Sequence, residues 1–117
     1  MTAGLDMAAL RALGDLVDRN LAAWQELLQA HLDYSAHLVE TIICAQTDRD
    51  LAALGRAAHT LKSSSALFGA NALAKACAAT ELAALKQLPE TVDLSVQVIA
   101  EAAKARVELE LWRDRVP

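Results

Sequence analysis

The apolar residues of this chain recur at intervals of three and four, and most of them are alanine and leucine. Both residue types rank at the top of intrinsic helix propensity, and the interval places them on one side of an α-helix. Strand-forming residues never alternate over a useful length, and four glycines and two prolines leave little material for the turns of an all-β fold. The chain of 117 residues is long enough for one core, so we predict a single all-α domain over residues 1–117.

Breaks in the apolar pattern predict where the first helices begin and end. A short amphipathic helix is expected at residues 5–13, ended by Gly14, and a longer one begins at about Asp18. The sequence DYS at residues 33–35 contains a good N-cap and weak helix formers. We therefore expect a joint there, with a new helix after Ser35.

The second half of the chain contains three further helix signals. The sequence TDRD at residues 47–50 is typical of a capping box and opens a helix that runs to about Phe68, before Gly69. Asn71 is expected to cap a helix that ends near Gln87, because a proline follows in LPE. The last helix is expected from Thr91 to Arg115, with one apolar side made of Val92, Val96, Ile99, Ala103, Val107 and Leu111.

The connections between these helices are short, which predicts antiparallel neighbours and therefore an up-and-down helical bundle. The bundle is expected over residues 18–115, with residues 1–17 as an N-terminal helical extension. Trp24 and Trp112 are expected to be packing residues between helices.

Charge and hydropathy exclude several classes of protein. The net charge of −4 argues against a nucleic-acid partner, because a polyanionic backbone requires a basic surface. No window holds eighteen consecutive apolar residues free of charge, so no membrane insertion is expected. The first residues lack a basic region followed by an apolar run. We therefore expect a cytoplasmic protein.

The cysteines and histidines do not form a metal-binding pattern. Cys44 and Cys77 are isolated in apolar helical context and are expected to be reduced core thiols, rather than a disulfide or metal pair. His31, His37 and His59 lack ligand spacing. His31 and His37 are expected to be partly exposed structural residues.

His59 differs from the other two histidines in its surroundings. On a helical wheel of residues 47–68, a core stripe about 100° wide is formed by Leu51, Leu54, Ala58, Leu61, Ser65 and Phe68. His59 lies more than about 120° from the centre of this stripe. Its neighbours on the outward face are Gly55, Arg56, Lys62 and Ser63, followed one turn further out by Ala52 and Ala66.

The imidazole is thus predicted to project from a surface of small residues, with a cation on each side. A glycine inside a helix costs about 1 kcal/mol relative to alanine, which makes sense if another protein must approach closely. Two cations make sense if the ring acquires negative charge. An ordinary exposed histidine without a function is the alternative.

The stretch AHTLKSSSALFGANALAKACAATE, residues 58–81, resembles the signature of histidine-containing phosphotransfer (HPt) domains. In that signature the histidine is followed by Leu, Lys and small residues, then by an apolar residue with Gly, and later by a Leu-Glu-like pair. A looser match precedes it at Asp50, Leu54 and Ala58. The resemblance covers about residues 18–115. It implies an antiparallel up-and-down four-helix bundle with an additional N-terminal helix.

The resemblance also implies a function. HPt domains relay phosphoryl groups between aspartates of response-regulator receiver domains, often from a hybrid sensor histidine kinase. His59 would be the phosphoacceptor, attacking through Nε2, and Lys62 would offset the phosphoryl charge. Arg56, on position alone, would add to this. No cofactor of its own and no autonomous kinase activity are implied, because the receiver would supply Mg²⁺.

Two further positions are interpreted through the resemblance. Glu81 occupies a place where the family carries a polar residue near the histidine, and would orient Nε2 by accepting a hydrogen bond from the other ring nitrogen. An exposed Glu near a helix end is the alternative. Ser63 stands where the family usually has Gly, and is expected to narrow access to the imidazole without blocking it. The small residues Ala52, Gly55 and Ala66 are expected to lie under a docked partner.

Two other functions remain open from the sequence. One is an HPt-fold interaction module that docks a partner that is not a receiver domain. The other is a plain structural bundle, in which the motif would have no function. The lysine beside the histidine favours phosphotransfer over both, because docking alone does not require that pair. A monomer is expected, since such a bundle needs no second chain.

Overall fold

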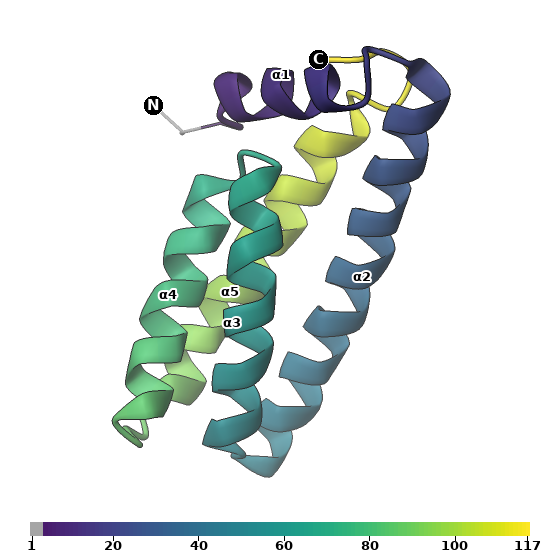
Figure 1. The fold of residues 1–117 in the computed structure, drawn as a ribbon. Helices are drawn as coiled ribbons and strands as arrows, with labels where there is room; N and C mark the ends of the chain where they lie inside the picture. Colours follow the sequence, from purple (N-terminus) through teal and green to yellow (C-terminus); the bar gives the residue numbers. More distant parts are fainter. Residues whose placement is uncertain (1–3) are drawn as a thin grey trace.

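The computed structural model describes residues 4–117, and every regular element within them is a helix (Figure 1). The five helices are α1 (Met7–Leu16), α2 (Leu21–Asp48), α3 (Leu51–Leu67), α4 (Asn71–Leu85) and α5 (Thr91–Glu110). Helices α2 to α5 lie alongside one another, and α1 lies across the end of the molecule that also holds the C-terminus (Figure 1). The predicted all-helical class is confirmed. Residues 1–3 of the predicted N-terminal extension lie outside the described residues.

The joint predicted at residues 33–35 is wrong, because α2 is continuous from Leu21 to Asp48. Neither Gly nor Pro occurs within this helix. The carboxylate of Asp33 accepts a hydrogen bond from Nε2 of Gln29, one turn earlier, at 2.8 Å. A potential N-cap residue therefore lies on the helix surface, and buried residues resume beyond it with Leu38, Ile42 and Ala45.

Two predicted caps are also corrected. Thr47 belongs to α2, where its hydroxyl donates to the carbonyl of Ile43 at 3.2 Å, so the predicted capping box does not form. Asp50 itself is the N-cap of α3 and accepts from the backbone N–H of Ala53 at 3.0 Å. At α4 the N-cap is Ala70, and Asn71 is the first helical residue rather than the cap.

Gly69 and Gly14 were both predicted to end a helix, but only Gly69 does so in the structure. Gly69 follows α3 with a φ of +72°, and a Cβ there would lie 2.6 Å from the carbonyl oxygen of Asp6, so Gly69 ends the helix as predicted. Gly14 does not end α1, because it lies inside that helix and is buried. A Cβ on Gly14 would lie 2.9 Å from Cγ1 of Val116. Its role is to let the C-terminal residues pack against α1.

The last two helices end earlier than predicted, at Leu85 instead of Gln87 and at Glu110 instead of Arg115. Residues after Glu110 turn back toward α1 and α2 instead of continuing the helix. Trp24 is fully buried, and its Nε1 donates to the carbonyl of Trp112 at 2.8 Å. Both tryptophans therefore pack helices together, as predicted.

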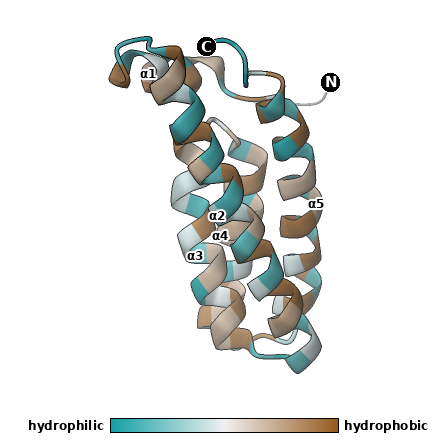
Figure 2. Cartoon of the chain, turned by 90° about the vertical axis from the view of Figure 1, so that its right-hand side faces the viewer, coloured by the Kyte–Doolittle hydropathy of each residue, from teal (hydrophilic) through white to brown (hydrophobic). Residues whose placement is uncertain are grey.

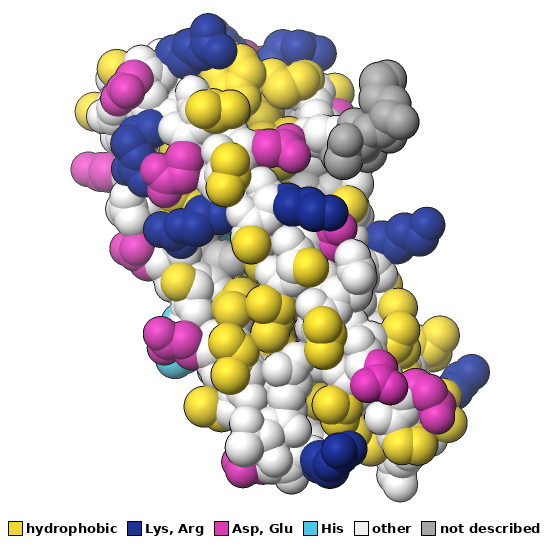
Figure 3. All heavy atoms as spheres, turned by 180° about the vertical axis from the view of Figure 1, so that it is seen from behind, with side chains coloured by type: hydrophobic (Ala, Val, Ile, Leu, Met, Phe, Trp, Pro, Cys, Tyr) yellow, Lys and Arg dark blue, Asp and Glu magenta, His cyan; other side chains and the backbone are white. Residues whose placement is uncertain are grey.

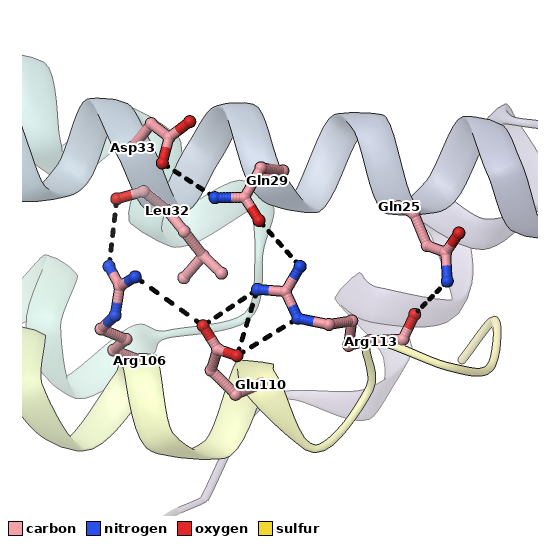
Figure 4. Close-up of polar contacts among 7 residues, drawn as sticks. All are labelled: Gln25, Gln29, Leu32, Asp33, Arg106, Glu110 and Arg113. Carbon is pink, nitrogen blue, oxygen red and sulfur yellow. Dashed lines mark hydrogen bonds and ion pairs between the residues drawn. The ribbon is translucent and has the colours of Figure 1, made fainter.

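A polar network joins α2 to the end of α5 (Figure 4). The guanidinium of Arg113 donates to Oε1 of Gln29 at 2.7 Å and forms an ion pair with Glu110 at 3.0 Å. Arg106 donates to the carbonyl oxygen of Leu32 at 3.3 Å. These contacts fix the position of α5 along the length of α2.

The core is formed by two groups of buried side chains, and Figure 2 shows hydrophobic residues recurring between hydrophilic ones along the helices. The larger group lies between α2, α3, α4 and α5 and includes Leu38, Ile42, Leu54, Ala58, Leu61, Leu73, Cys77 and Val98. The second lies beneath α1 and comprises Leu10, Leu13, Trp24, Leu28, Leu32, Phe68 and Leu109. Within residues 4–117, no helix is both long enough and apolar enough to cross a membrane.

The predicted apolar side of the last helix is not the buried one. The residues of α5 that face the core are Thr91, Ser95, Val98, Ala102, Ala105 and Leu109. Val96, Val107 and Leu111, which were predicted to face it, are 58%, 66% and 72% exposed. Thr91 and Ser95 can be buried because each hydroxyl donates to a backbone carbonyl three residues earlier, at 2.6 Å.

Two of the expectations for cysteine and histidine are wrong. Cys44 is exposed, whereas Cys77 is buried and burial raises the pKa of its thiol to about 12. His31 is not partly exposed but buried, and its ring stacks on Phe68 with 4.1 Å between the ring centroids. Burial lowers the pKa of His31 to about 4. His37 is exposed.

Ser65 offers a test of the α3 core. Its hydroxyl is fully buried and has no hydrogen-bond partner among the described residues. An unpaired buried hydroxyl costs about 1–3 kcal/mol, and Ala is also the better helix former. We therefore expect Ser65→Ala to raise the free energy of unfolding by about 1 kcal/mol, measured by urea denaturation. A less stable variant would show that the hydroxyl is satisfied.

Candidate functional site

The candidate site lies on the outward side of α3. The buried side of this helix contains Leu54, Ala57, Ala58, Leu61 and Ser65. These residues fix the rotation of the helix, because turning them away from the core would expose several apolar side chains. His59 lies on the opposite side, and its side chain is 64% exposed. The imidazole is therefore accessible to another molecule.

Glu81 on α4 contacts both His59 and Lys62 of α3. Its Oε2 lies 2.5 Å from Nδ1 of His59, and its Oε1 lies 2.5 Å from Nζ of Lys62. An ionised carboxylate can only accept hydrogen bonds, so Nδ1 of His59 carries the proton and donates it. The Nε2 atom of the neutral ring then has a free electron pair.

The ion pair between Lys62 and Glu81 changes the electrostatics of the site. The pKa of Glu81 is held below its usual value, first by the hydrogen bond from Lys62 and further by the hydrogen bond from His59. The carboxylate thus stays ionised at mildly acidic pH. Lys62, predicted as a charge partner for a phosphoryl group, is paired with Glu81 in this state.

An open groove of about 850 Å³ lies beside the histidine, between α3 and α4. Its lining includes five of the residues singled out from the sequence, which are Ala52, Gly55, Arg56, His59 and Glu81. Ser63 is exposed one turn beyond His59, outside this lining. Ala66 is exposed further along α3 and also does not line the groove. The expected docking residues are thus divided between the groove and the helix surface above it.

Several groove residues were not identified from the sequence. They are Leu51, Thr60, Ala84, Leu85 and Gln87. Leu51 was assigned to the core stripe, and Leu85, which is 75% exposed, was given no role. One signal was available: apolar residues surround the whole circumference of α4, whose sequence is NALAKACAATELAAL. A surface helix of this kind carries more apolar residues than the core requires.

Gly55 has a structural reason that the sequence did not reveal. A Cβ added at Gly55 would lie 2.7 Å from Cβ of Ala84 on α4. Both atoms are attached directly to the backbone, so neither can move without shifting its helix. Gly55 therefore allows α3 and α4 to approach closely, which is what brings Glu81 within reach of His59.

This contact predicts the effect of a larger residue. We expect Gly55→Ala to lower the free energy of unfolding by up to about 2 kcal/mol, since overpacking of this kind costs about 1–3 kcal/mol and the gain in helix propensity offsets about 1 kcal/mol. Ala84→Gly in the same chain should remove the clash. Urea denaturation of both variants provides the measurement, and a stable Gly55→Ala single variant would contradict the close approach.

The sequence matches the Hpt domain family over residues 24–113. The structure resembles that of histidine-containing phosphotransfer protein B (HptB) from Pseudomonas aeruginosa PAO1, with a TM-score of 0.85 and 25% sequence identity. The match covers 97% of this chain and 96% of the HptB chain. No curated protein matches the sequence significantly. Because the family match covers most of its length, the chain belongs to the Hpt domain family.

Proposed function

We propose that this chain is a phosphorelay protein that accepts a phosphoryl group on His59 from an aspartate of a receiver domain and passes it to another receiver domain. Membership of the Hpt family supports a role in histidine phosphotransfer. The observation that carries the assignment to His59 is its exposed imidazole, held at Nδ1 by Glu81 at 2.5 Å. Among the three histidines, His31 is buried and His37 has no acidic partner among the described residues.

The proposed step forms one bond and breaks one bond. The electron pair of His59 Nε2 attacks the phosphorus of the aspartyl phosphate, and the bond from phosphorus to the aspartate oxygen breaks. The electrons of that bond return to the aspartate as a carboxylate. The proton on Nδ1 stays in place, so the phosphorylated ring is cationic. Glu81 stabilises this charge from the opposite side of the ring, as a carboxylate does for a catalytic histidine in other enzymes.

The cations of the site are proposed to offset the charge of the transferred group. Lys62, which does not line the groove, would turn from Glu81 toward the phosphoryl oxygens, and Arg56 lines the groove beside His59. Both oxygens of Glu81 are already engaged by His59 and Lys62. The described groove lining contains no second carboxylate. We therefore propose that Mg²⁺ comes with the receiver domain and that this chain contributes no ligand set of its own.

The groove beside His59 is the proposed docking surface for the receiver domain. Its apolar lining by Leu51, Ala52 and Leu85 suits contact with another protein. The receiver would also cover Ser63 and Ala66, which lie beyond His59 along α3. A hybrid sensor histidine kinase is the proposed source of the phosphoryl group.

The fold proposed to carry this function is the antiparallel up-and-down four-helix bundle of an HPt domain. Helices α2 to α5 would form the bundle, with α1 as the additional N-terminal helix, in a single domain. This arrangement is supported by the structural match to HptB over nearly the whole chain.

The decisive experiment is incubation of the chain with a receiver domain phosphorylated on its aspartate. We expect an acid-labile, alkali-stable label on the wild type and none on His59→Gln. His37→Gln is the matched control, because it removes another exposed histidine and should keep the label. Wild type left unlabelled by several receivers would instead favour an HPt-fold interaction module that docks a different kind of partner.

Ser63 gives a prediction about access to the imidazole. The side chain is exposed and lies one turn after His59, where the family usually carries Gly. Because serine is small, we expect Ser63→Gly to change the rate of phosphoryl transfer by no more than a few-fold. The initial rate of labelling at fixed receiver concentration is the measurement. A large change would show that Ser63 controls access.

A further inference from the structure

A second apolar surface lies away from the His59 groove, over α2 and α5. We call it the α2–α5 patch, and it comprises Val92, Val96, Ile99, Ala103 and Val107 of α5 with Ala36, Val39 and Ile43 of α2. Viewed from behind, hydrophobic side chains gather over the middle of the molecule (Figure 3). Val39, Ile99 and Ala103 line a groove of about 230 Å³ between the two helices. None of the patch residues lines the groove of His59.

Part of α5 departs from the usual arrangement in which polar residues face water and apolar residues face the core. Its core side carries the hydroxyl residues Thr91 and Ser95, both fully buried. Its outer side carries Val96 and Val107, which are 58% and 66% exposed. β-Branched residues are weaker helix formers than Ala, Lys or Glu, so they bring no advantage on a helix surface that faces only water. Contact with the apolar surface of another molecule would bury these valine side chains, which explains their presence on the outer side.

The α2–α5 patch has an internal symmetry that points to its partner. On α5, Val92 and Val96 precede Ile99, and Ala103 and Val107 follow it at nearly equal intervals. On α2, Ala36 and Ile43 lie on either side of Val39. Val39 and Ile99 lie at the same level, since both line the groove between the helices. A two-fold axis through this level would place the residues before Ile99 in one copy against the residues after Ile99 in a second copy, and the reverse.

Two charged residues on one flank of α5 lie nearly symmetrically about Ile99 and have opposite signs, whereas Arg106 lines the groove on the other side of the helix. Asp93 lies six residues before Ile99 and Lys104 lies five residues after it. Eleven residues correspond to about three helical turns, so both side chains lie on the same flank of α5. Both are exposed, and the ion pair of Lys104 with Glu101 is long, at 3.4 Å. In an antiparallel pair, Asp93 of each copy would face Lys104 of the other copy, which gives two equivalent ion pairs.

We propose that the α2–α5 patch binds a second copy of this chain, with the two α5 helices antiparallel. The interface is isologous: apolar side chains of the two patches meet around Ile99, and two symmetric ion pairs between Asp93 and Lys104 set the orientation. The His59 groove lies between α3 and α4, so both copies of the dimer keep their phosphotransfer site free.

The oligomeric state tests this proposal directly. Sedimentation equilibrium of the full chain over a wide concentration range is expected to show a mass rising from 12.5 kDa toward twice that value. Val96→Glu places a charge within the apolar interface, one turn from Ile99, and is expected to raise the dissociation constant at least tenfold. Leu16→Glu is the control, because Leu16 is 74% exposed on α1 and should leave association unchanged. Circular dichroism of each variant verifies the helical fold.

Charge reversal distinguishes the proposed geometry from nonspecific association. Asp93→Lys and Lys104→Asp should each weaken the dimer several-fold, because each places like charges opposite one another twice. The double variant restores opposite charges and should recover the affinity of the wild type. A wild type that stays monomeric at every concentration would overturn the proposal. So would a dimer that Val96→Glu leaves intact, or single reversals that the double variant does not rescue.

Discussion

Replacement of Glu81 by glutamine is expected to slow phosphorylation of His59 about tenfold to a hundredfold. The carboxylate has two acceptor oxygens, one for Nδ1 of His59 and one for Nζ of Lys62, each at 2.5 Å. A glutamine amide has only one acceptor oxygen. The NH₂ group that replaces the other oxygen can only donate, and it would face either Nδ1 of His59 or Nζ of Lys62, both of which donate to Glu81 in the structure. The substitution also removes the negative charge that stabilises the cationic ring during attack.

The measurement is the initial rate of labelling by a phosphorylated receiver domain, compared across pH. Glu101→Gln is a matched control, because Glu101 is similarly buried, pairs with Lys104 and lies on α5. It should leave the rate unchanged. Glu81→Gln should also change the pH dependence of the rate at acidic pH, since the carboxylate whose pKa is lowered by the hydrogen bonds from Lys62 and His59 is no longer present to titrate. An equal rate and an unchanged pH profile would show that Glu81 neither orients nor stabilises the imidazole.

The outward position of His59 could be predicted from the sequence because one face of α3 is clearly apolar. Leu54, Ala58 and Leu61 are fully buried, so spacing alone fixed which side of the helix faces water. The same reasoning failed for α5. There, the hydroxyls of Thr91 and Ser95 donate to backbone carbonyls three residues earlier, those of Leu88 just before α5 and of Val92 within it. Hydropathy cannot show that such residues will be buried.

The contacts of the site required information that the sequence pattern does not contain. Glu81 was placed near His59 only through the family resemblance, and its simultaneous contact with Lys62 was not foreseen. That contact depends on the distance between α3 and α4, which Gly55 and Ala84 determine. The glycine was interpreted as space for a partner, because a pattern within one helix does not show which neighbouring helix approaches it.

The N-cap predictions were wrong where a side chain could form a hydrogen bond either at the end of a helix or within one. Asp33 follows the pattern of an N-cap, yet its side chain accepts a hydrogen bond from Gln29 within an unbroken helix. Thr47 likewise bonds back to Ile43 rather than capping α3. Ser, Thr and Asp compete for backbone groups both inside and at the ends of helices. The outcome depends on whether the apolar stripe continues, and in α2 it does.

Acidification from pH 6.5 to pH 4 is expected to lower the free energy of unfolding through His31 by about 3 kcal/mol. Burial lowers the pKa of His31 to about 4, from 6.5 in the unfolded chain. Between these values the unfolded state binds a proton that the folded state does not bind, so stability falls as the pH falls. Well above pH 6.5 the ring is neutral in both states and contributes no pH dependence.

The variant His31→Phe separates this effect from the titration of carboxylates over the same range. It keeps an aromatic ring stacked on Phe68, where the centroids lie 4.1 Å apart, and removes the titrating group. Urea denaturation at several pH values should show a weaker pH dependence for the variant than for the wild type, by about 3 kcal/mol between pH 6.5 and 4. His37→Gln is the control, since the exposed ring of His37 remains in water on folding. Equal slopes for His31→Phe and wild type would mean that the folded protein admits the proton at His31, and that the stacked ring is not held away from water.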